Sequence, residues 1–233
     1  MPKDISELLD ILNFGNENKI LLVEAMTHKS YSAEHNLNYD NQRLEFLGDA
    51  VLQILITEYL YTRYTDEQEG KLTKMRSALA RQAAFAKLAR KLNISEYIRM
   101  GKGEMKSVGN ERVSTLCDAF EALAGAIYLD GGLEPVAELI MPMLKEVFPD
   151  PSELLADLNP KGMLQEYTQK HCSSERPEYH IESKNGPDHD CEYVITVSVR
   201  GRVIGKGKGK SRKSAEMAAA ANALTALKNT IGD

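Results

Sequence analysis

Apolar residues recur every three or four positions through the first 148 residues, which is the spacing of amphipathic helices. The pattern predicts helices at residues 4–13, 17–29, 40–64, 70–91, 94–100, 110–129 and 132–147. Asp40 or Asn41 can cap the helix at 40–64, and the glycine pair at 131–132 separates the last two. Because strand signals are nearly absent, we expect an all-α domain over residues 1–148.

The pattern changes after a proline-rich stretch. Residues 148–162, FPDPSELLADLNPKG, hold three prolines and a cluster of acids, so 149–158 is predicted to be a linker between domains. Beyond it we expect a helix at 162–172, alternating strands at 178–186, 191–201 and 202–209, and an Ala-rich helix at 210–228. This α-β-β-β-α order predicts a small α+β domain over 159–228.

Composition excludes some classes of protein. No apolar run approaches the ~20 residues of a membrane span, and the acidic, amphipathic N-terminus does not resemble a signal peptide. Cys117, Cys172 and Cys191 are far apart and form no CxxC pair, which argues against a zinc site. We therefore expect a protein of the reducing cytoplasm with no membrane partner.

The net charge of −5 hides an asymmetry between the two predicted domains. Residues 159–228 carry 12 Lys and Arg against 8 Asp and Glu, whereas residues 1–158 carry 17 against 25. The basic second domain and the acidic first domain are expected to do different work.

Two pairs of acids lie on apolar helices. In NQRLEFLGDAVL (41–52), Glu45 and Asp49 are four residues apart and share one helix face. In LCDAFEALAGAIYLD (116–130), Asp118 and Glu121 are three apart. Asp118 shares its stripe with Gly125, which would let another helix approach closely.

Buried like charges are unfavourable unless a positive group meets them. One pair alone could form a salt bridge to Arg43 or Arg76, or favour a helix dipole as an N-terminal acid. Two pairs in one helical domain favour a shared metal site.

Four carboxylates without His or Cys suit Mg²⁺ or Mn²⁺. In phosphoryl chemistry such ions activate a water and stabilise the leaving oxygen. A di-iron site is set aside, because no Glu has a His three residues later. Pyrophosphohydrolases of small nucleotides also use helical carboxylates and stay as an alternative.

The segment RGRVIGKGKGKSRK (200–213) carries seven Lys and Arg and no acid. Gly205, Gly207 and Gly209 alternate with lysines, and we interpret these glycines as allowing close approach to a ligand. The run enters a predicted helix start with Ser211 as N-cap, where free N–H groups favour phosphate. With no aromatic stacking pattern, the segment indicates recognition of duplex RNA by shape and phosphate.

These motifs resemble those of the bacterial type of ribonuclease III. NQRLEFLGDAVL resembles the signature helix of the family, and AMTHKSY (25–31) and LCDAFEALAGAIYLD resemble its other blocks, in the same order. Residues 159–228 resemble its C-terminal double-stranded-RNA-binding domain. The similarity covers nearly the whole chain.

The resemblance implies a Mg²⁺-dependent homodimer in which each subunit supplies one site and cuts one strand of double-stranded RNA. The products would carry 5′-phosphate and 3′-hydroxyl ends with two-nucleotide 3′ overhangs. Precursors of rRNA and structured mRNAs would be the substrates.

The resemblance also implies roles for single residues. Glu45, Asp118 and Glu121 would hold the metal, with Glu121 the ligand most sensitive to loss, and Asp49 and Glu121 would be catalytic. Glu69 would be an accessory acid near the subunit interface. One position departs from the family pattern, because Gln42 replaces the usual glutamate of the signature helix. A neutral amide is a poor Mg²⁺ ligand, so an RNA-contacting or outer role there is in doubt.

The family's RNA contacts would fall on three patches. They are Gln165 and Glu166 on the first helix, Pro187 and His189 between the first two strands, and Lys208, Lys210, Ser211, Arg212 and Lys213 before and at the last helix. Glu216 stands where many such domains carry a lysine, so one phosphate contact is expected to be missing. The loop at 101–112 is a further candidate for RNA contact.

Two alternatives to the endonuclease stay open on the sequence. A non-catalytic scaffold that binds double-stranded RNA would be expected to have a damaged acid set, and this set is intact. A Mg²⁺-dependent hydrolase of small nucleotides would explain the acids but would leave the basic domain without a role.

Overall fold

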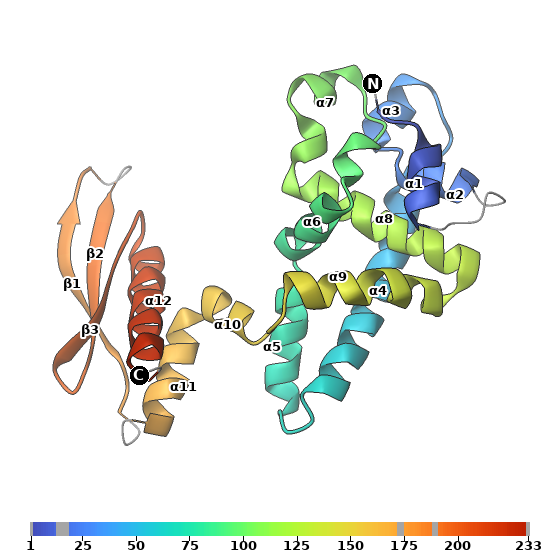
Figure 1. The fold of residues 1–233 in the computed structure, drawn as a ribbon. Helices are drawn as coiled ribbons and strands as arrows, with labels where there is room; N and C mark the ends of the chain where they lie inside the picture. The colour runs from blue at the N-terminus through green and yellow to red at the C-terminus, as the bar shows by residue number, and fades with distance from the viewer. Residues whose placement is uncertain (1, 13–18, 172–174, 188–190, 232–233) are drawn as a thin grey trace. The chain divides into compact units, whose positions relative to one another are not determined.

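The computed structural model describes residues 2–12, 19–171, 175–187 and 191–231. Within these ranges the chain forms two compact units, Met1–Pro151 and Ser152–Asp233. The first unit is helical and the second combines helices with an antiparallel sheet (Figure 1), which confirms the predicted fold class. No helix in the described ranges is long and apolar enough to cross a membrane.

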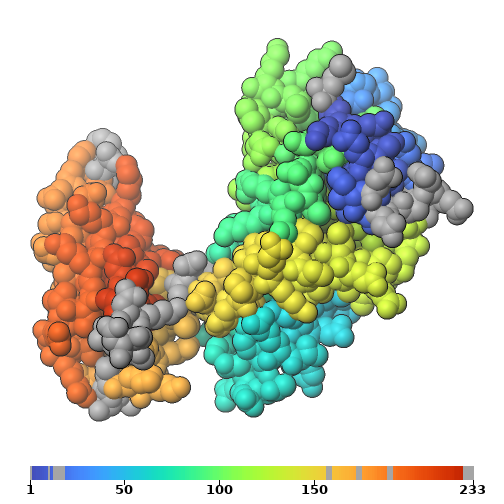
Figure 2. All heavy atoms as spheres, viewed as in Figure 1, coloured from blue at the N-terminus to red at the C-terminus, as the bar shows by residue number. Residues whose placement is uncertain are grey.

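The N-terminal unit is built from helices of very different lengths. They are α1 (Ile5–Leu12), α2 (Lys19–Ala25), α3 (Lys29–Glu34), α4 (Gln42–Arg63), α5 (Glu69–Leu79), α6 (Gln82–Lys91), α7 (Lys102–Lys106), α8 (Val113–Gly131) and α9 (Leu133–Val147), with 3₁₀ turns η2 (Ile94–Glu96) and η3 (Gly109–Glu111). Helix α9 packs against α4, α6 and α8, and its outer side chains form the yellow band across this unit in Figure 2.

Helices α4 and α8 form the centre of this unit, and they meet at two glycines. A Cβ atom at Gly48 would lie 1.7 Å from the carbonyl oxygen of Glu121, and one at Gly125 would lie 2.3 Å from the carbonyl oxygen of Leu44. Both distances are well below van der Waals contact, so a larger residue at either position would push the helices apart. The expected close approach of a helix at Gly125 is confirmed.

Tertiary pairing interrupts the helix predicted at 17–29. The His28 N–H donates to the Arg99 carbonyl at 3.0 Å, and the Arg99 N–H donates to the Met26 carbonyl at 2.7 Å. Because these backbone groups pair across the unit, they are not available to a helix, and α2 and α3 are separate. The same pairing ends the helical turn of the predicted 94–100 segment after Glu96.

The helix predicted at 70–91 is also two helices. The chain leaves α5 at Ala80, and Arg81 has an extended backbone (φ −75°, ψ 150°) before α6 begins. No glycine or proline lies at this break, and the apolar spacing continues across it. The hydrophobic pattern alone therefore predicted one helix. The change of direction allows Leu79 and Phe85 both to be fully buried.

The C-terminal unit has the expected element order with one addition. Its elements are α10 (Glu153–Leu158), α11 (Pro160–His171), β1 (Glu178–Asn185), β2 (Glu192–Val199), β3 (Arg202–Gly209) and α12 (Arg212–Ile231). The strands pair antiparallel in the order β1-β2-β3. Arg200 and Gly201 both have positive φ (55° and 70°), as in the two-residue type I′ turn that suits a twisted hairpin.

Helix α10 lies in the segment that was expected to be a linker. Leu154 and Leu155 are buried, and α10 contacts α11 and α12. The segment 149–158 therefore holds a helix of the second unit, because its paired leucines find apolar partners there.

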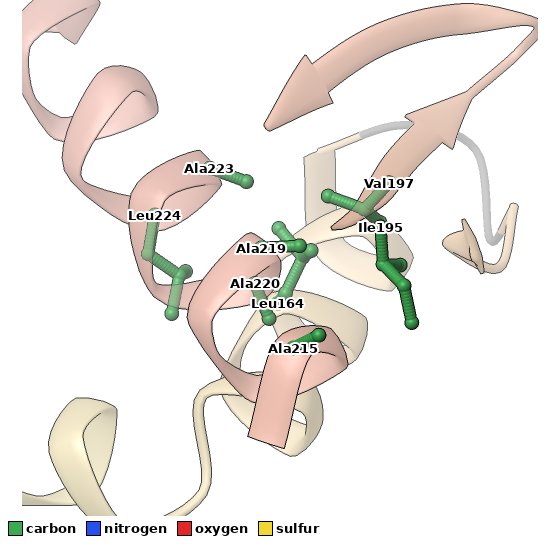
Figure 3. Close-up of a cluster of buried hydrophobic side chains, with 8 residues drawn as sticks. All are labelled: Leu164, Ile195, Val197, Ala215, Ala219, Ala220, Ala223 and Leu224. Atoms are coloured by element: carbon green, nitrogen blue, oxygen red, sulfur yellow. The ribbon is translucent and has the colours of Figure 1, made fainter. Parts of the chain in front are cut away.

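The core of the C-terminal unit lies between the sheet and an Ala-rich helix face. Figure 3 shows its members, Leu164, Ile195, Val197, Ala215, Ala219, Ala220, Ala223 and Leu224. Gly205, Gly207 and Gly209 of β3 face this helix: their Cβ atoms would lie 2.4 Å from the Ala219 oxygen, 2.1 Å from the Ala219 nitrogen and 2.3 Å from the Ser214 Oγ. These glycines therefore serve helix-on-sheet packing, which corrects the interpretation that they admit a ligand.

Candidate catalytic centre and RNA-binding surface

The crossing of α4 and α8 brings the two acid pairs together. Glu45 and Asp49 lie on α4 on either side of Gly48, and Asp118 and Glu121 lie on α8. Glu121 is 9% exposed, and the other three are partly exposed. The pairs therefore share one partly enclosed site on the N-terminal unit.

The electrostatics show that the four carboxylates act on one another. Burial raises the pKa of Glu121 to about 7, and the charges of Asp49, Glu45 and Asp118 add to this effect. Burial also raises the pKa of Glu45, and the charge of Asp118 on the other helix raises it further. The two helices thus bring negative charges into mutual repulsion.

Little positive charge relieves this repulsion. Within the described residues, none of the four acids forms an ion pair. The Arg76 guanidinium instead donates to the Thr57 hydroxyl at 3.4 Å, so a salt bridge from Arg76 does not account for the acids. Burial raises the pKa of Asp118 too, although the charges of His28 and Lys29 oppose this shift.

His28 and Lys29 belong to the AMTHKSY motif, and the fold explains their place. The His28 Nδ1 accepts from the Ser30 N–H at 3.2 Å and caps α3, which begins at Lys29. Burial lowers the pKa of His28, and the charges of Glu104 and Asp118 oppose this shift.

Two neutral donors hold the acids, and neither was predicted from the sequence. The Cys117 thiol donates to the Glu121 Oε1 at 3.4 Å, and the Gln53 Nε2 donates to both Asp49 oxygens at 3.0 and 2.9 Å. Each donor lies one helical turn from its acid, so the four-residue spacing was the signal that could have found it. Burial raises the pKa of the Cys117 thiol well above its usual range, which keeps the thiol protonated as a donor.

The donor set fits a hard divalent cation. Among the described residues, one ligand atom each from Cys117, Asp118 and Glu121 lie within 4.8 Å of one another, and Glu45 and Asp49 are not part of this cluster. Oxygen donors and uncompensated negative charge are what Mg²⁺ and Mn²⁺ require, and a cation would stabilise the charged carboxylates that burial and mutual repulsion penalise.

The other candidates of this unit lie elsewhere on its surface. Glu69 is the exposed first residue of α5, and its carboxylate accepts from the Thr73 hydroxyl at 2.9 Å. Gln42 is exposed at the start of α4, and its backbone N–H donates to the Asp40 carboxylate at 3.0 Å. The segment 101–112 is ordered by α7, η3 and an ion pair between Arg112 and Glu104 at 2.8 Å.

In the C-terminal unit, the predicted RNA contacts at the start of α12 lie together. The Ser214 N–H donates to the Ser211 Oγ at 3.1 Å, so Ser211 caps the helix as predicted. Arg212 and Lys213 occupy the first turn and are exposed, and Lys210 precedes them. Cations there oppose the helix dipole, although Arg212 also forms an ion pair with Glu216 one turn later.

The other RNA candidates are spread over the unit. Gln165 and Glu166 are exposed on α11 and Pro187 is exposed after β1, whereas His189 lies outside the described residues. Lys208 is not brought to the α12 surface: it alternates with the glycines that face α12, and so projects from the opposite side of β3. There its Nζ lies 3.7 Å from a Glu192 carboxylate oxygen.

Both units match known proteins. Residues 18–147 match the family model "Ribonuclease-III-like", and residues 160–227 match "Double-stranded RNA binding motif". The chain is 42% identical to Ribonuclease 3 of Nitratiruptor sp. over 97% of its length and 98% of that protein. It is 46% identical to Ribonuclease 3 of Desulforamulus reducens, over 93% of this chain and 88% of the relative.

A solved structure agrees with the N-terminal unit. The nuclease domain of ribonuclease III from Campylobacter jejuni, described for structural flexibility in the region involved in dimer formation, matches with a TM-score of 0.59 and 39% identity. The match covers 63% of this chain and 100% of that domain. With both domains and their order matched, this chain belongs to the ribonuclease III family of endoribonucleases.

Proposed function

We propose that the protein is a Mg²⁺-dependent endoribonuclease that cuts double-stranded RNA and leaves 5′-phosphate and 3′-hydroxyl ends with two-nucleotide 3′ overhangs. The nuclease activity would reside in residues 1–148 and duplex binding in residues 159–228. The observation that supports the proposal is the glycine crossing of α4 and α8, across which the charges of Asp49 and Glu45 act on the buried Glu121. The match to a double-stranded-RNA-binding motif supplies the substrate class.

Each acid would have its own role at this site. Glu45, Asp118 and Glu121 would hold the ion, and Asp49, fixed by Gln53, would complete or orient the ligand shell. The bound ion, Mg²⁺ or Mn²⁺, would supply activation of the attacking water and stabilisation of the leaving 3′-oxygen. Glu121 must lose its proton to bind the ion, and its pKa of about 7 means that ion and proton compete at neutral pH.

A homodimer is the proposed assembly. Phe46, Ile54 and Tyr61 of α4 are 84%, 58% and 73% exposed, and their spacing places them on one side of the helix. Beside Phe46 is a hollow of about 680 Å³ lined by Leu21, Leu44, Leu47 and Leu129, among others. An apolar stripe next to an apolar hollow is a self-complementary surface of the kind that two-fold dimers use.

The proposed setting is the cytoplasm, where the substrates would be rRNA precursors and structured mRNAs. Cys117 and Cys191 are free thiols in the structure, which is compatible with a reducing compartment. Mapping of RNA 5′ ends in cells that lack the protein would identify the substrates.

Cleavage of a long, end-labelled RNA duplex tests the proposed reaction. We expect short duplexes with two-nucleotide 3′ overhangs in Mg²⁺, no cleavage in chelator, and a Glu121→Gln variant that binds duplex without cutting. Wild-type binding without cleavage in Mg²⁺ would favour the scaffold alternative. Release of nucleoside monophosphates from small nucleotides, independent of RNA, would favour the hydrolase alternative.

A further inference from the structure

Glu216 of α12 has both carboxylate oxygens engaged by cations from two helices. The Arg212 Nε donates to Oε1 at 2.9 Å, and the Lys161 Nζ of α11 donates to Oε2 at 2.5 Å. The Glu216 side chain is only 12% exposed, whereas the Arg212 side chain is 64% exposed. The Lys161 ammonium also lies over the Tyr179 ring, 4.4 Å from its centroid. A nearly buried carboxylate therefore joins α11 to the first turn of α12.

This arrangement leaves the phosphate-binding edge of Arg212 available. A guanidinium is planar and carries five N–H donors, so an ion pair through Nε fixes its plane while the four donors on Nη1 and Nη2 stay on its outer part. A side chain that is already held in place loses less conformational entropy when it binds a ligand.

The charge of Glu216 is balanced inside the unit. Although burial opposes ionisation, the hydrogen bonds from Lys161 and Arg212 lower the pKa of Glu216 below its usual value, so the carboxylate is ionised at pH 7. Two cations on one anion leave the surface around Glu216 net positive. This glutamate is therefore compatible with an RNA phosphate nearby.

We propose that Glu216 is a positioning residue for duplex RNA, which holds Arg212 in the orientation that meets a phosphate and ties the α11 edge with Gln165 to the start of α12. The proposal rests on the RNA surface proposed above. Glu216 was expected to mean that one phosphate contact is missing. In this proposal it instead orients Arg212 for a phosphate contact.

The direction in which Glu216→Gln changes the affinity for duplex RNA tests the proposal. If Glu216 acted only through its charge, Glu216→Gln would bind RNA phosphates more tightly. A positioning role predicts the opposite: about fivefold weaker binding of a labelled RNA duplex by the full chain in chelator. The plot of log K against log salt should also become shallower by about one phosphate contact.

A double-mutant cycle assigns the effect to Arg212. Arg212→Gln alone should weaken duplex binding, and Glu216→Gln should cause less weakening in that background than in the wild type, because only the tie to α11 is left to lose. Arg212→Lys keeps the charge but loses the planar fork, and we expect it to weaken binding nearly as much as Arg212→Gln. Because Arg212 is exposed, Arg212→Lys should not disturb folding. It therefore tests the orientation of the Arg212 side chain even if Glu216→Gln lowers the melting temperature.

The matched control is Glu182→Gln. Glu182 pairs with Lys206 at 2.7 Å in the same unit, and its loss should not weaken duplex binding. The positioning role would be overturned if Glu216→Gln bound the duplex as tightly as the wild type or more tightly while Arg212→Gln bound it more weakly. That result would leave the proposed RNA surface intact. Unchanged binding by Arg212→Gln would overturn the proposed surface at α12 and the positioning role with it.

Discussion

Glu121 is the acid of this site at which burial and the neighbouring carboxylates most strongly disfavour the charged form. It is the most buried of the four acids, and its pKa is about 7 against a usual 4.5. The raised pKa means that the folded protein favours the protonated carboxyl, because burial and three neighbouring carboxylates penalise the charged form. The same penalty is a driving force for binding a cation.

This shift predicts how the stability of the metal-free protein depends on pH. A carboxyl whose pKa is raised by folding imposes no penalty below its unfolded pKa, and the penalty grows as pH rises through 4.5 towards 7. In chelator we expect Glu121→Gln to match the wild type near pH 4.5 and to exceed it in free energy of unfolding at pH 8, by on the order of 2 kcal/mol. Urea unfolding at both pH values measures this difference.

Saturating Mg²⁺ provides the control for that experiment. It should raise the melting temperature of the wild type at pH 8 and have a smaller effect on Glu121→Gln, because one ligand is missing. The same pH profile for both proteins in chelator would contradict a strained Glu121.

Cys117 is expected to act on the ion through Glu121. Cys117→Ala removes the thiol donor but leaves little cavity, and loss of such an outer partner typically weakens metal binding by about tenfold. Cys117→Ser keeps a donor and should retain most of the affinity. Titration with Mn²⁺, followed by electron paramagnetic resonance, measures binding without RNA.

Cys191→Ala is the matched variant for Cys117→Ala. Cys191 is also a buried free thiol, but it lies in the C-terminal unit at the start of β2. Its loss should leave Mn²⁺ binding unchanged. If Cys117→Ala also binds Mn²⁺ with wild-type affinity, the thiol has no positioning role.

Glycines determine how the elements pack in both units. In the first unit Gly48 and Gly125 let α4 and α8 touch, and in the second the glycines of β3 let α12 lie on the sheet. In each case a proposed functional surface depends on the contact. The acid pairs lie at the first contact, and the start of α12 is placed by the second.

The α4–α8 crossing should not tolerate a methyl group. We expect Gly48→Ala to lower the free energy of unfolding by about 3 kcal/mol, because its Cβ would lie 1.7 Å from the Glu121 carbonyl oxygen and must displace a helix. Duplex cleavage should fall as the acid pairs separate. Urea unfolding and the cleavage assay measure the two effects.

Gly103→Ala serves as the control for Gly48→Ala. Gly103 lies within α7, and its Cβ would meet nothing within 4 Å, so this change should leave stability equal or slightly higher. A Gly48→Ala variant as stable as Gly103→Ala would show that the helices do not cross this closely in solution.

For the whole molecule, the exposed apolar stripe on α4 predicts the assembly. Phe46→Glu places a charge at its most exposed residue and should convert the proposed dimer to a monomer in sedimentation velocity. Val203→Glu changes a residue that is 58% exposed on β3 of the C-terminal unit, and it should leave the dimer intact. A wild type that sediments as a monomer would overturn the dimer.

Much of this molecule could be predicted from local sequence patterns. The all-α and α+β units, the α-β-β-β-α order of elements and the Ser211 cap follow from hydrophobic period and capping chemistry, which act within a few residues. The facing of each acid pair follows from three- and four-residue helical spacing, and residue types and motif order were enough to identify the family.

Contacts between distant segments decided the rest. Backbone pairing of Arg99 with Met26 and His28 divided a predicted helix. The β3 glycines pack against α12, and Lys208 therefore projects from the opposite face of the strand. The partners of Glu216 lie 4 and 55 residues away, on two helices. Such features depend on which surfaces meet after the chain has folded. A local sequence pattern does not specify which distant segment will pack against it.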